Sequence, residues 1–134
     1  FCECMPGKLN QVFMNLISNG IQAIGHKRAL ADTPSDYEGK ITIRTELCSN
    51  EGRGKTACIE IKDNGIGMEK QVSQRIFEPF FTTKDVGSGI GLGLSITFGI
   101  IEQHQGNIEV ESEPGKGSTF RILIPVQQSP QTDR

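Results

Sequence analysis

Apolar side chains recur every three or four residues in the stretch that follows Pro6-Gly7. This spacing is typical of an amphipathic helix, and it predicts one that runs to about Ile24. A second helix is predicted over residues 92–104, because Gly106 follows as a signal for a helix C-terminus. Residues 69–76 are compatible with a short helix. The apolar positions of the first helix are Leu9, Val12, Phe13, Leu16, Ile17, Ile21 and Ile24.

Four other stretches alternate apolar and polar residues, as half-buried strands do. Short turns with glycines, at 49–55 and 113–117, join them in pairs and favour antiparallel hairpins. The order helix, hairpin, helix, hairpin predicts an α+β fold, namely a two-layer α/β sandwich. Its sheet is expected to be mixed but mostly antiparallel, with the helices on one face. The strands are predicted over residues 40–47, 56–62, 107–112 and 118–124.

Length and charge narrow the class of protein. The 134 residues are enough for one domain with a real core. We expect this domain to span residues 1–126, followed by a disordered tail over residues 127–134. The net charge of −2 gives no basic footprint for nucleic acid. No apolar run has the length of a membrane span, and the first residue is Phe1, which suggests a fragment of a longer protein.

The four cysteines are Cys2, Cys4, Cys48 and Cys58. Their spacing lacks the paired two-residue intervals of a zinc site. Reduced thiols are the favoured interpretation. A disulfide between Cys48 and Cys58 stays open in case their strands pair.

Neutral amides lie along one side of the first predicted helix. Gln11, Asn15 and Asn19 are four residues apart, on the side away from the apolar stripe. Amide oxygens can bind Mg²⁺ and amide N–H groups can donate to phosphate. A polar side that simply faces water is an equally good interpretation of this helix alone.

Asp63 follows a predicted strand and precedes two glycines. A buried carboxylate needs a partner, and an exocyclic amine such as that of adenine offers a suitable donor. Gly65 and Gly67 would let the backbone approach a flat base. The alternative is a simple Asx-turn, since Asp-Asn-Gly is a common turn sequence, and this is the better interpretation of the segment alone.

A glycine-rich loop at residues 87–93 leads into the second predicted helix. Backbone N–H groups and the positive end of a helix dipole both favour phosphate there. The preceding residues 78–91 form a long loop with an aromatic anchor, as functional lids often do. The spacing fits neither a dinucleotide fingerprint nor a P-loop. Neither histidine, His26 nor His104, is expected to be catalytic.

In this order the segments resemble the catalytic ATP-binding domain of sensor histidine kinases, in the Bergerat-fold superfamily that also includes DNA gyrase and the heat-shock chaperone. The resemblance covers residues 9–125. It rests on five motifs, which resemble the N box (QVFMNLISN, 11–19), the G1 box (DNGIG, 63–67), the F box (FEPFFTTK, 77–84), the G2 box (GIGLGLS, 89–95) and the final glycine turn (GKGSTF, 115–120).

The resemblance implies ATP and Mg²⁺ as cofactors and assigns roles to single residues. Asn15 and Asn19 would hold Mg²⁺ and phosphate, and Asp63 would accept a hydrogen bond from the adenine amino group. Gly65 and Gly67 would border the base. Arg75 and Lys84 would lie near the transferred phosphate, and with Asn15 they are the candidate catalytic residues. The phosphate-binding loop would comprise Gly89, Gly91, Leu92 and Gly93.

Two departures from the family pattern matter. Ile90 stands where the family usually has a small hydroxyl residue. The phosphoacceptor histidine is missing, and the resemblance places it on a separate dimerisation domain of the same parent kinase. The expected partners are therefore ATP, that domain and, indirectly, the receiver domain of a response regulator. The isolated chain would be a monomer.

The expected activity is donation of the ATP γ-phosphate to a histidine. The ATPase branches carry a glutamate as general base in the N box, whereas Asn15 cannot take a proton. Two alternatives stay open, namely a stand-alone kinase of the anti-sigma-factor type and a degenerate binding module without catalysis. The expected location is cytoplasmic, and an inner-membrane anchor on the parent protein stays open.

Overall fold

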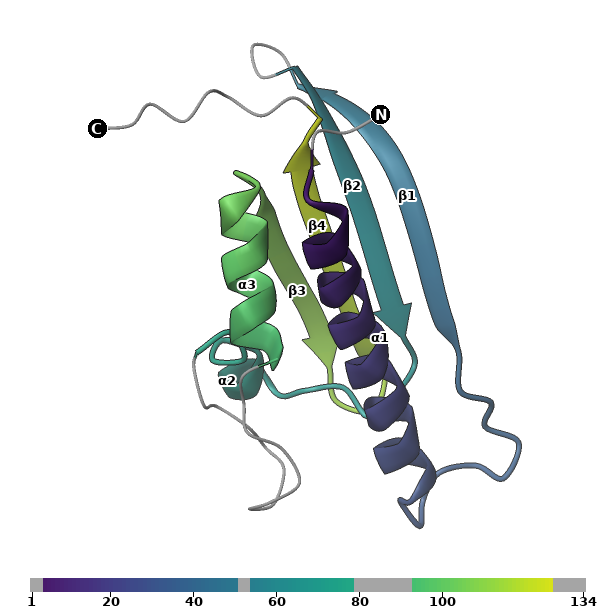
Figure 1. Ribbon diagram of the computed structural model, residues 1–134. Helices are drawn as coiled ribbons and strands as arrows, with labels where there is room; N and C mark the ends of the chain where they lie inside the picture. Colours follow the sequence, from purple (N-terminus) through teal and green to yellow (C-terminus); the bar gives the residue numbers. More distant parts are fainter. Residues whose placement is uncertain (1–3, 51–53, 79–92, 127–134) are drawn as a thin grey trace.

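The computed structural model describes residues 4–50, 54–78 and 93–126. Three helices and four strands form two layers in this part of the chain (Figure 1). In chain order they are α1 (Pro6–Arg28), β1 (Ile41–Asn50), β2 (Gly54–Asp63), α2 (Lys70–Ser73), α3 (Gly93–Gln103), β3 (Asn107–Glu113) and β4 (Gly117–Pro125).

The four strands form one sheet in the order β1-β2-β4-β3. The predicted hairpins β1–β2 and β3–β4 are present, and β2 joins β4 to unite them. All three ladders are antiparallel, so the parallel component of the expected mixed sheet is absent from the described strands. The predicted class, an α+β sandwich with helices on one face, is confirmed (Figure 1).

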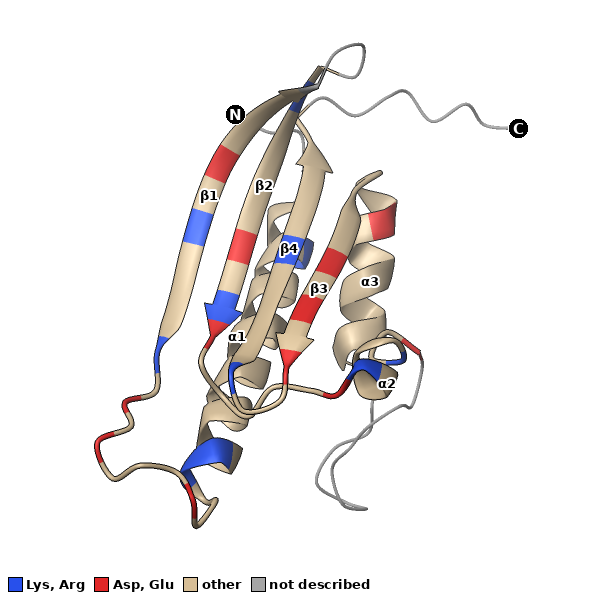
Figure 2. Ribbon diagram, turned by 180° about the vertical axis from the view of Figure 1, so that it is seen from behind, with Lys and Arg blue, Asp and Glu red and all other residues tan. Residues whose placement is uncertain are grey.

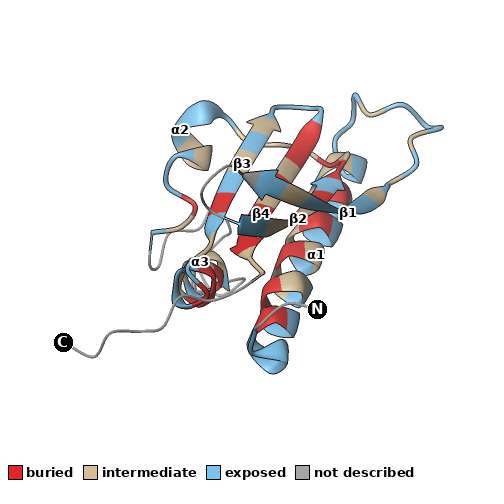
Figure 3. Cartoon of the chain, turned by 90° about the horizontal axis from the view of Figure 1, so that it is seen from above, coloured by how far each residue is buried: buried red, intermediate tan, exposed pale blue. Residues whose placement is uncertain are grey.

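Apolar residues of α1, α3 and the inner sheet face make the core. Val12 and Leu16 of α1 and Ile122 of β4 are almost fully buried. Seen from above, the buried sides of α1 and α3 face the sheet (Figure 3). The rest of the core is contributed mainly by Leu9, Ile61, Ile76, Ile100, Ile101, Ile108, Phe120 and Ile124.

The helix α1 is longer than its pattern predicted. We expected an end near Ile24, because Gly25 looks like a stop signal, but the helix continues to Arg28. Its last turn carries His26, Lys27 and Arg28, and cations there suit the negative end of the helix dipole. Lys27 also donates to the carbonyl of Gly115 at 2.7 Å, which holds this turn in place. The predicted loop therefore begins at Ala29.

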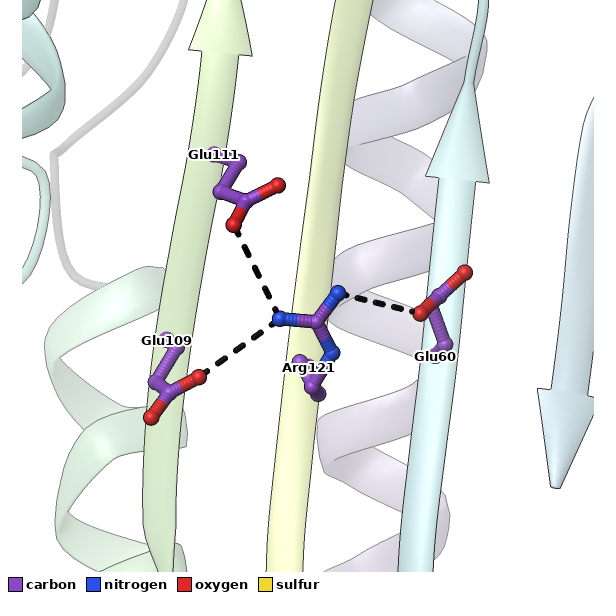
Figure 4. Close-up of polar contacts among 4 residues, drawn as sticks. All are labelled: Glu60, Glu109, Glu111 and Arg121. Carbon is purple, nitrogen blue, oxygen red and sulfur yellow. Dashed lines mark hydrogen bonds and ion pairs between the residues drawn. The ribbon is translucent and has the colours of Figure 1, made fainter. Parts of the chain in front are cut away.

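No helix of the described residues covers the opposite face of the sheet (Figure 2). Arg121 of β4 lies at its centre (Figure 4). Its guanidinium is 3.2 Å from the carboxylate of Glu60 on β2, and 3.6 and 3.8 Å from those of Glu109 and Glu111 on β3. These pairs set one positive charge against three negative ones, so the cluster keeps a net negative charge. They explain how the outer face stays polar while every second residue of β4 packs inward.

His104 is buried and joins the ends of the two long helices. Its Nδ1 lies 2.8 Å from the carbonyl of Ile100, and its Nε2 accepts the backbone N–H of Met5 at 3.0 Å. One ring nitrogen must therefore donate and the other accept, which fixes the neutral Nδ1–H tautomer. The residue ties the end of α3 to the start of α1.

The cysteines Cys4, Cys48 and Cys58 are free thiols. Cys48 pairs with Thr56 and Cys58 with Glu46, so the two cysteines are diagonal and not directly opposite each other. Reduced thiols were the favoured expectation, and no disulfide forms among the described cysteines. In the described residues no helix is long and apolar enough to cross a membrane.

Candidate functional site

One side of α1 links the three parts of the candidate site. Asn15, Asn19 and Ala23 are spaced by four residues and therefore lie in line along the helix. Asn15 contacts the beginning of α3, because its Nδ2 is 3.3 Å from both the Gly93 carbonyl and the Thr97 hydroxyl. Ala23 contacts the loop after β2, since its carbonyl accepts the N–H of Ile66 at 3.0 Å. Asn19 lies between these two contacts and is half-buried.

The distance along α1 between the Asn15 and Ala23 contacts follows from helix geometry. Eight residues of α-helix separate Asn15 from Ala23, which corresponds to about 12 Å at 1.5 Å per residue. α3 begins at Gly93 at one end of this span, and Gly65 and Ile66 pack against Ala23 at the other, with Asp63 beside Gly20 in between. Gly93, the last residue of the glycine-rich segment, and the loop after Asp63 thus both lie next to α1, at helix positions about 12 Å apart.

Asp63 is the last residue of β2 and is 5% exposed. Its Oδ1 accepts the backbone N–H of Gly65 at 2.9 Å, so the Asx-turn is real. Burial raises the pKa of the Asp63 carboxyl, and hydrogen bonds from the backbone N–H groups of Gly65 and Ser118 partly oppose this rise. No Lys or Arg forms an ion pair with Asp63 among the residues that the structure describes. Such a carboxylate is suited to a neutral N–H donor.

The two glycines after Asp63 are required by close packing inside the protein. A Cβ on Gly65 would lie 2.6 Å from the carbonyl carbon of Ala23, so this residue fits the loop against α1. Gly67 has a φ of +70°, and a Cβ there would collide with the carbonyl oxygen of Glu113. Gly65 and Gly67 were also expected to border a base. The contacts described here lie within the protein, so a contact with a base stays a prediction.

The turn between β3 and β4 closes over the Asp63 loop. The N–H of Gly115 donates to the carbonyl of Ile66 at 2.6 Å. Gly117 has a φ of +115°, and a Cβ on it would collide with the carbonyl oxygen of Asp63. The predicted glycine turn therefore fixes the position of Asp63, beyond joining two strands.

Asn64, next to Asp63, fixes the other side of the loop. Its side chain accepts the N–H of Lys40 at 2.7 Å and donates to the carbonyl of Glu38 at 2.8 Å. Tyr37 donates its hydroxyl to the Asn64 carbonyl at 2.8 Å, and the ammonium group of Lys27 lies 4.7 Å from the Tyr37 ring centre. Asp63 is thus held in place by contacts on both sides of its loop.

Of the remaining candidate site residues, the structure describes only Arg75 and Gly93. Arg75 follows α2, and its exposed side chain is 3.1 Å from the carboxylate of Glu78. Gly93 is the first residue of α3. Lys84, Gly89, Gly91 and Leu92 lie outside the described residues, as does most of the expected lid.

Sequence reasoning missed three hydroxyl residues near the site. Thr97 is fully buried and donates to the Gly93 carbonyl at 2.9 Å, so it shares the contacts of Asn15. Ser112 and Ser118 face each other across the β3–β4 hairpin. The spacing of Thr97 four residues after Gly93 was a usable signal, whereas the serine pair depends on the strand register.

Comparison with known proteins decides the family. The family model described as "Histidine kinase-, DNA gyrase B-, and HSP90-like ATPase" matches residues 5–128. This chain belongs to that family. The expected resemblance is confirmed, and ATP binding is a property of the family to which the domain belongs.

Curated relatives with similar sequences are sensor kinases. Sporulation kinase E of Bacillus subtilis is 39% identical over 131 residues, which are 98% of this chain and 15% of that protein. The signal transduction histidine-protein kinase AtoS of Escherichia coli is 41% identical over 118 residues, which are 88% of this chain and 17% of that protein. The chain thus spans about a sixth of the length of these two relatives.

Solved structures agree with the sequence relatives. The catalytic domain of the histidine kinase ThkA has a TM-score of 0.69 and 31% identity, over 93% of this chain and 70% of that chain. The mycobacterial sensor histidine kinase MprB has a TM-score of 0.72 at 22% identity, which shows the shared fold. The fold is that of a histidine kinase catalytic domain.

Proposed function

We propose that this chain is the catalytic part of a longer sensor histidine kinase and transfers the γ-phosphate of ATP to a histidine on a separate dimerisation domain. The observation that carries the proposal is the line of contacts along α1. Asn15 contacts the start of α3, the buried acid Asp63 lies beside Gly20, and Ala23 contacts the loop that follows Asp63. The adenine amino group would donate to Asp63, and the phosphates would lie beside Asn15, Asn19 and Gly93.

The donor groups fit Mg²⁺. The described residues contain no cluster of three or more His, Cys, Asp or Glu side chains that would hold a metal by themselves. Mg²⁺ typically takes one or two protein oxygens and completes its shell with phosphates and water. The contacts of Asn15 to α3 use Nδ2, so its Oδ1 is the atom for a cation, with Asn19 one turn away. Bound Mg²⁺ would neutralise charge on the phosphates.

The chemistry expected of this chain is positioning and charge neutralisation, as in other phosphoryl transfers. The bond between the γ-phosphorus and its bridging oxygen breaks, a bond to an imidazole nitrogen of the partner forms, and ADP leaves. Asn15 cannot remove a proton from water, which favours transfer over hydrolysis. Arg75 and Lys84 stay candidates for contacts to the transferred phosphate. The second partner would be the receiver domain of a response regulator, and the proposed location is the cytoplasm.

Magnesium ATP is expected to raise the melting temperature of the chain, because a ligand that binds only the native state stabilises it. At a concentration 100 times its dissociation constant, the gain is about 2.7 kcal/mol. The measurement is a thermal melt with ATP, with and without Mg²⁺, and with GTP as the control. We also expect no acid-labile labelling of the isolated chain by γ-labelled ATP. A melt that ATP leaves unchanged would favour a degenerate module, and self-labelling would contradict the assignment of the acceptor to another domain.

A further inference from the structure

The hydroxyl of Ser112 is the centre of a small polar cluster in the sheet next to Asp63. Ser112 of β3 and Ser118 of β4 are directly paired in the strand register, and their hydroxyl oxygens are 2.7 Å apart. The Ser112 oxygen also accepts the backbone N–H of Met68 at 2.8 Å, and it donates to the carbonyl of Gly117 at 3.1 Å. Three segments of the chain therefore meet at one atom, namely the loop with Met68, the end of β3 and the start of β4.

These contacts use the full capacity of a hydroxyl group. A serine hydroxyl offers one donor and two lone pairs. Donation to Gly117 uses the hydrogen, so the Met68 N–H and the Ser118 O–H occupy the two lone pairs. With the Ser112 hydrogen on the Gly117 carbonyl, the Ser118 hydroxyl is the donor in its pair with Ser112.

The cluster continues directly to the candidate base-binding acid. Ser118 of β4 is the register partner of Asp63, and its backbone N–H lowers the pKa of the Asp63 carboxyl. Gly117 packs so closely on the backbone of Asp63 and Asn64 that a Cβ would collide there. Ser112 bonds to the carbonyl of Gly117 and to the side chain of Ser118. It therefore sets the direction of the backbone N–H of Ser118. It also holds Met68, at the other end of the loop that begins with Asp63.

We propose that Ser112 is a positioning residue for the adenine end of the ATP site, acting through Ser118 on Asp63. The inference rests on the proposed function. Ser112 touches neither base nor phosphate in this role. It keeps one hydrogen bond on the Asp63 carboxylate, so that the acid presents its remaining lone pairs to the amino group of the base in one orientation.

A merely structural serine would affect stability without affecting Asp63. The experiment therefore follows the carboxyl carbon of Asp63 by NMR during a pH titration, in the chain without nucleotide. Ser112→Ala is expected to move the titration midpoint upward, because the charged form loses a well-placed donor. Ser112→Thr keeps the hydroxyl and is expected to restore the wild-type midpoint. Ser73→Ala is the control, since the Ser73 hydroxyl bonds only locally to the Lys70 carbonyl in α2.

Calorimetric titration with ATP and with ADP gives the second readout. Ser112→Ala is expected to weaken both nucleotides by the same factor, about 3- to 10-fold, the size of about one lost hydrogen bond. An equal factor excludes a defect at the γ-phosphate, the only group that the two ligands do not share, and the shifted Asp63 midpoint then assigns it to the base. Ser112→Thr and Ser73→Ala are expected to stay within about twofold of wild type.

The possible results separate this inference from the function on which it rests. If wild type binds ATP and Ser112→Ala leaves the Asp63 midpoint or both affinities unchanged, the positioning role is wrong and the ATP site stands. If wild type binds no adenine nucleotide, both fall. Should Ser112→Ala not fold, Ser118→Ala removes the same hydroxyl pair from the other strand. An unchanged Asp63 midpoint in that variant overturns the inference.

Discussion

Asp63→Asn is expected to weaken ATP binding by about 10- to 150-fold. The carboxylate accepts from an amine, whereas an amide can turn an N–H toward that amine. A hydrogen bond to a charged group is worth about 1.5–3 kcal/mol, which gives this factor. The measurement is calorimetric titration of wild type and variant with magnesium ATP. Asp36→Asn makes the same chemical change at an exposed loop position and is expected to leave the affinity unchanged. Equal affinities of wild type and Asp63→Asn would remove Asp63 from the site.

The pH dependence has a definite sign. Burial raises the pKa of Asp63, so the carboxyl takes up its proton at a higher pH than an exposed aspartate, whose pKa is about 3.9. ATP affinity is expected to fall as the pH drops through this raised pKa. The folded state of the free chain binds the proton more tightly than the unfolded chain. Asp63 therefore lowers the free energy of unfolding as the pH rises from the unfolded to the folded pKa. The same series on Asp63→Asn corrects for titration of the nucleotide.

Gly117→Ala is expected to lower the free energy of unfolding by about 2–6 kcal/mol, as backbone strain and overpacking each cost about 1–3 kcal/mol. Its φ of +115° suits glycine, and the added Cβ would collide with the carbonyl oxygen of Asp63 and lie 2.9 Å from the Asn64 Cα. Both contacts are to backbone, which cannot move aside as a flexible side chain does. Urea denaturation measures the loss. A domain of this size has about 5–15 kcal/mol in total, so the loss would leave little reserve.

Gly115→Ala separates the two causes within the same turn. Gly115 has a φ of +80°, and an added Cβ would meet nothing within 4 Å. This variant is expected to lose only the strain part, about 1–3 kcal/mol. Equal losses for the two variants would contradict the close contact between Gly117 and the Asp63 loop.

The existence and type of the main elements could be predicted from periodicity alone, because most of them bury one face. β1 shows the same alternation, although Ile43 and Leu47 are exposed. The ends of the elements could not be predicted, since tertiary contacts decide them. Gly25 looked like a stop for α1, yet the bond from Lys27 to Gly115 extends the helix across it. The short helix predicted over 69–76 is only Lys70–Ser73, because the following residues form turns. The pairing of β2 with β4 has no local signal, since the two strands are far apart in the sequence.

In the candidate site, too, local sequence signals were predictable and tertiary contacts were not. The sequence presented Asp63 as a choice between a turn and a ligand-binding acid, whereas the structure shows the turn together with a buried carboxyl of raised pKa. A local turn therefore does not argue against a binding role. Ser112, Ser118 and Thr97 escaped notice because their importance depends on which strand or helix lies opposite, which one chain read in order does not reveal. The roles of Lys84 and the loop glycines stay predictions.

The central claim is that one nucleotide lies along α1 between Asp63 and the start of α3. The most direct measurement is a crystal structure of the chain with Mg²⁺ and a non-hydrolysable ATP analogue. The account predicts the adenine amino group within hydrogen-bond distance of the Asp63 carboxylate, and the phosphates beside Asn15, Asn19 and Gly93. A base bound elsewhere, with Asp63 contacting only the backbone of Gly65 and Ser118, would contradict it.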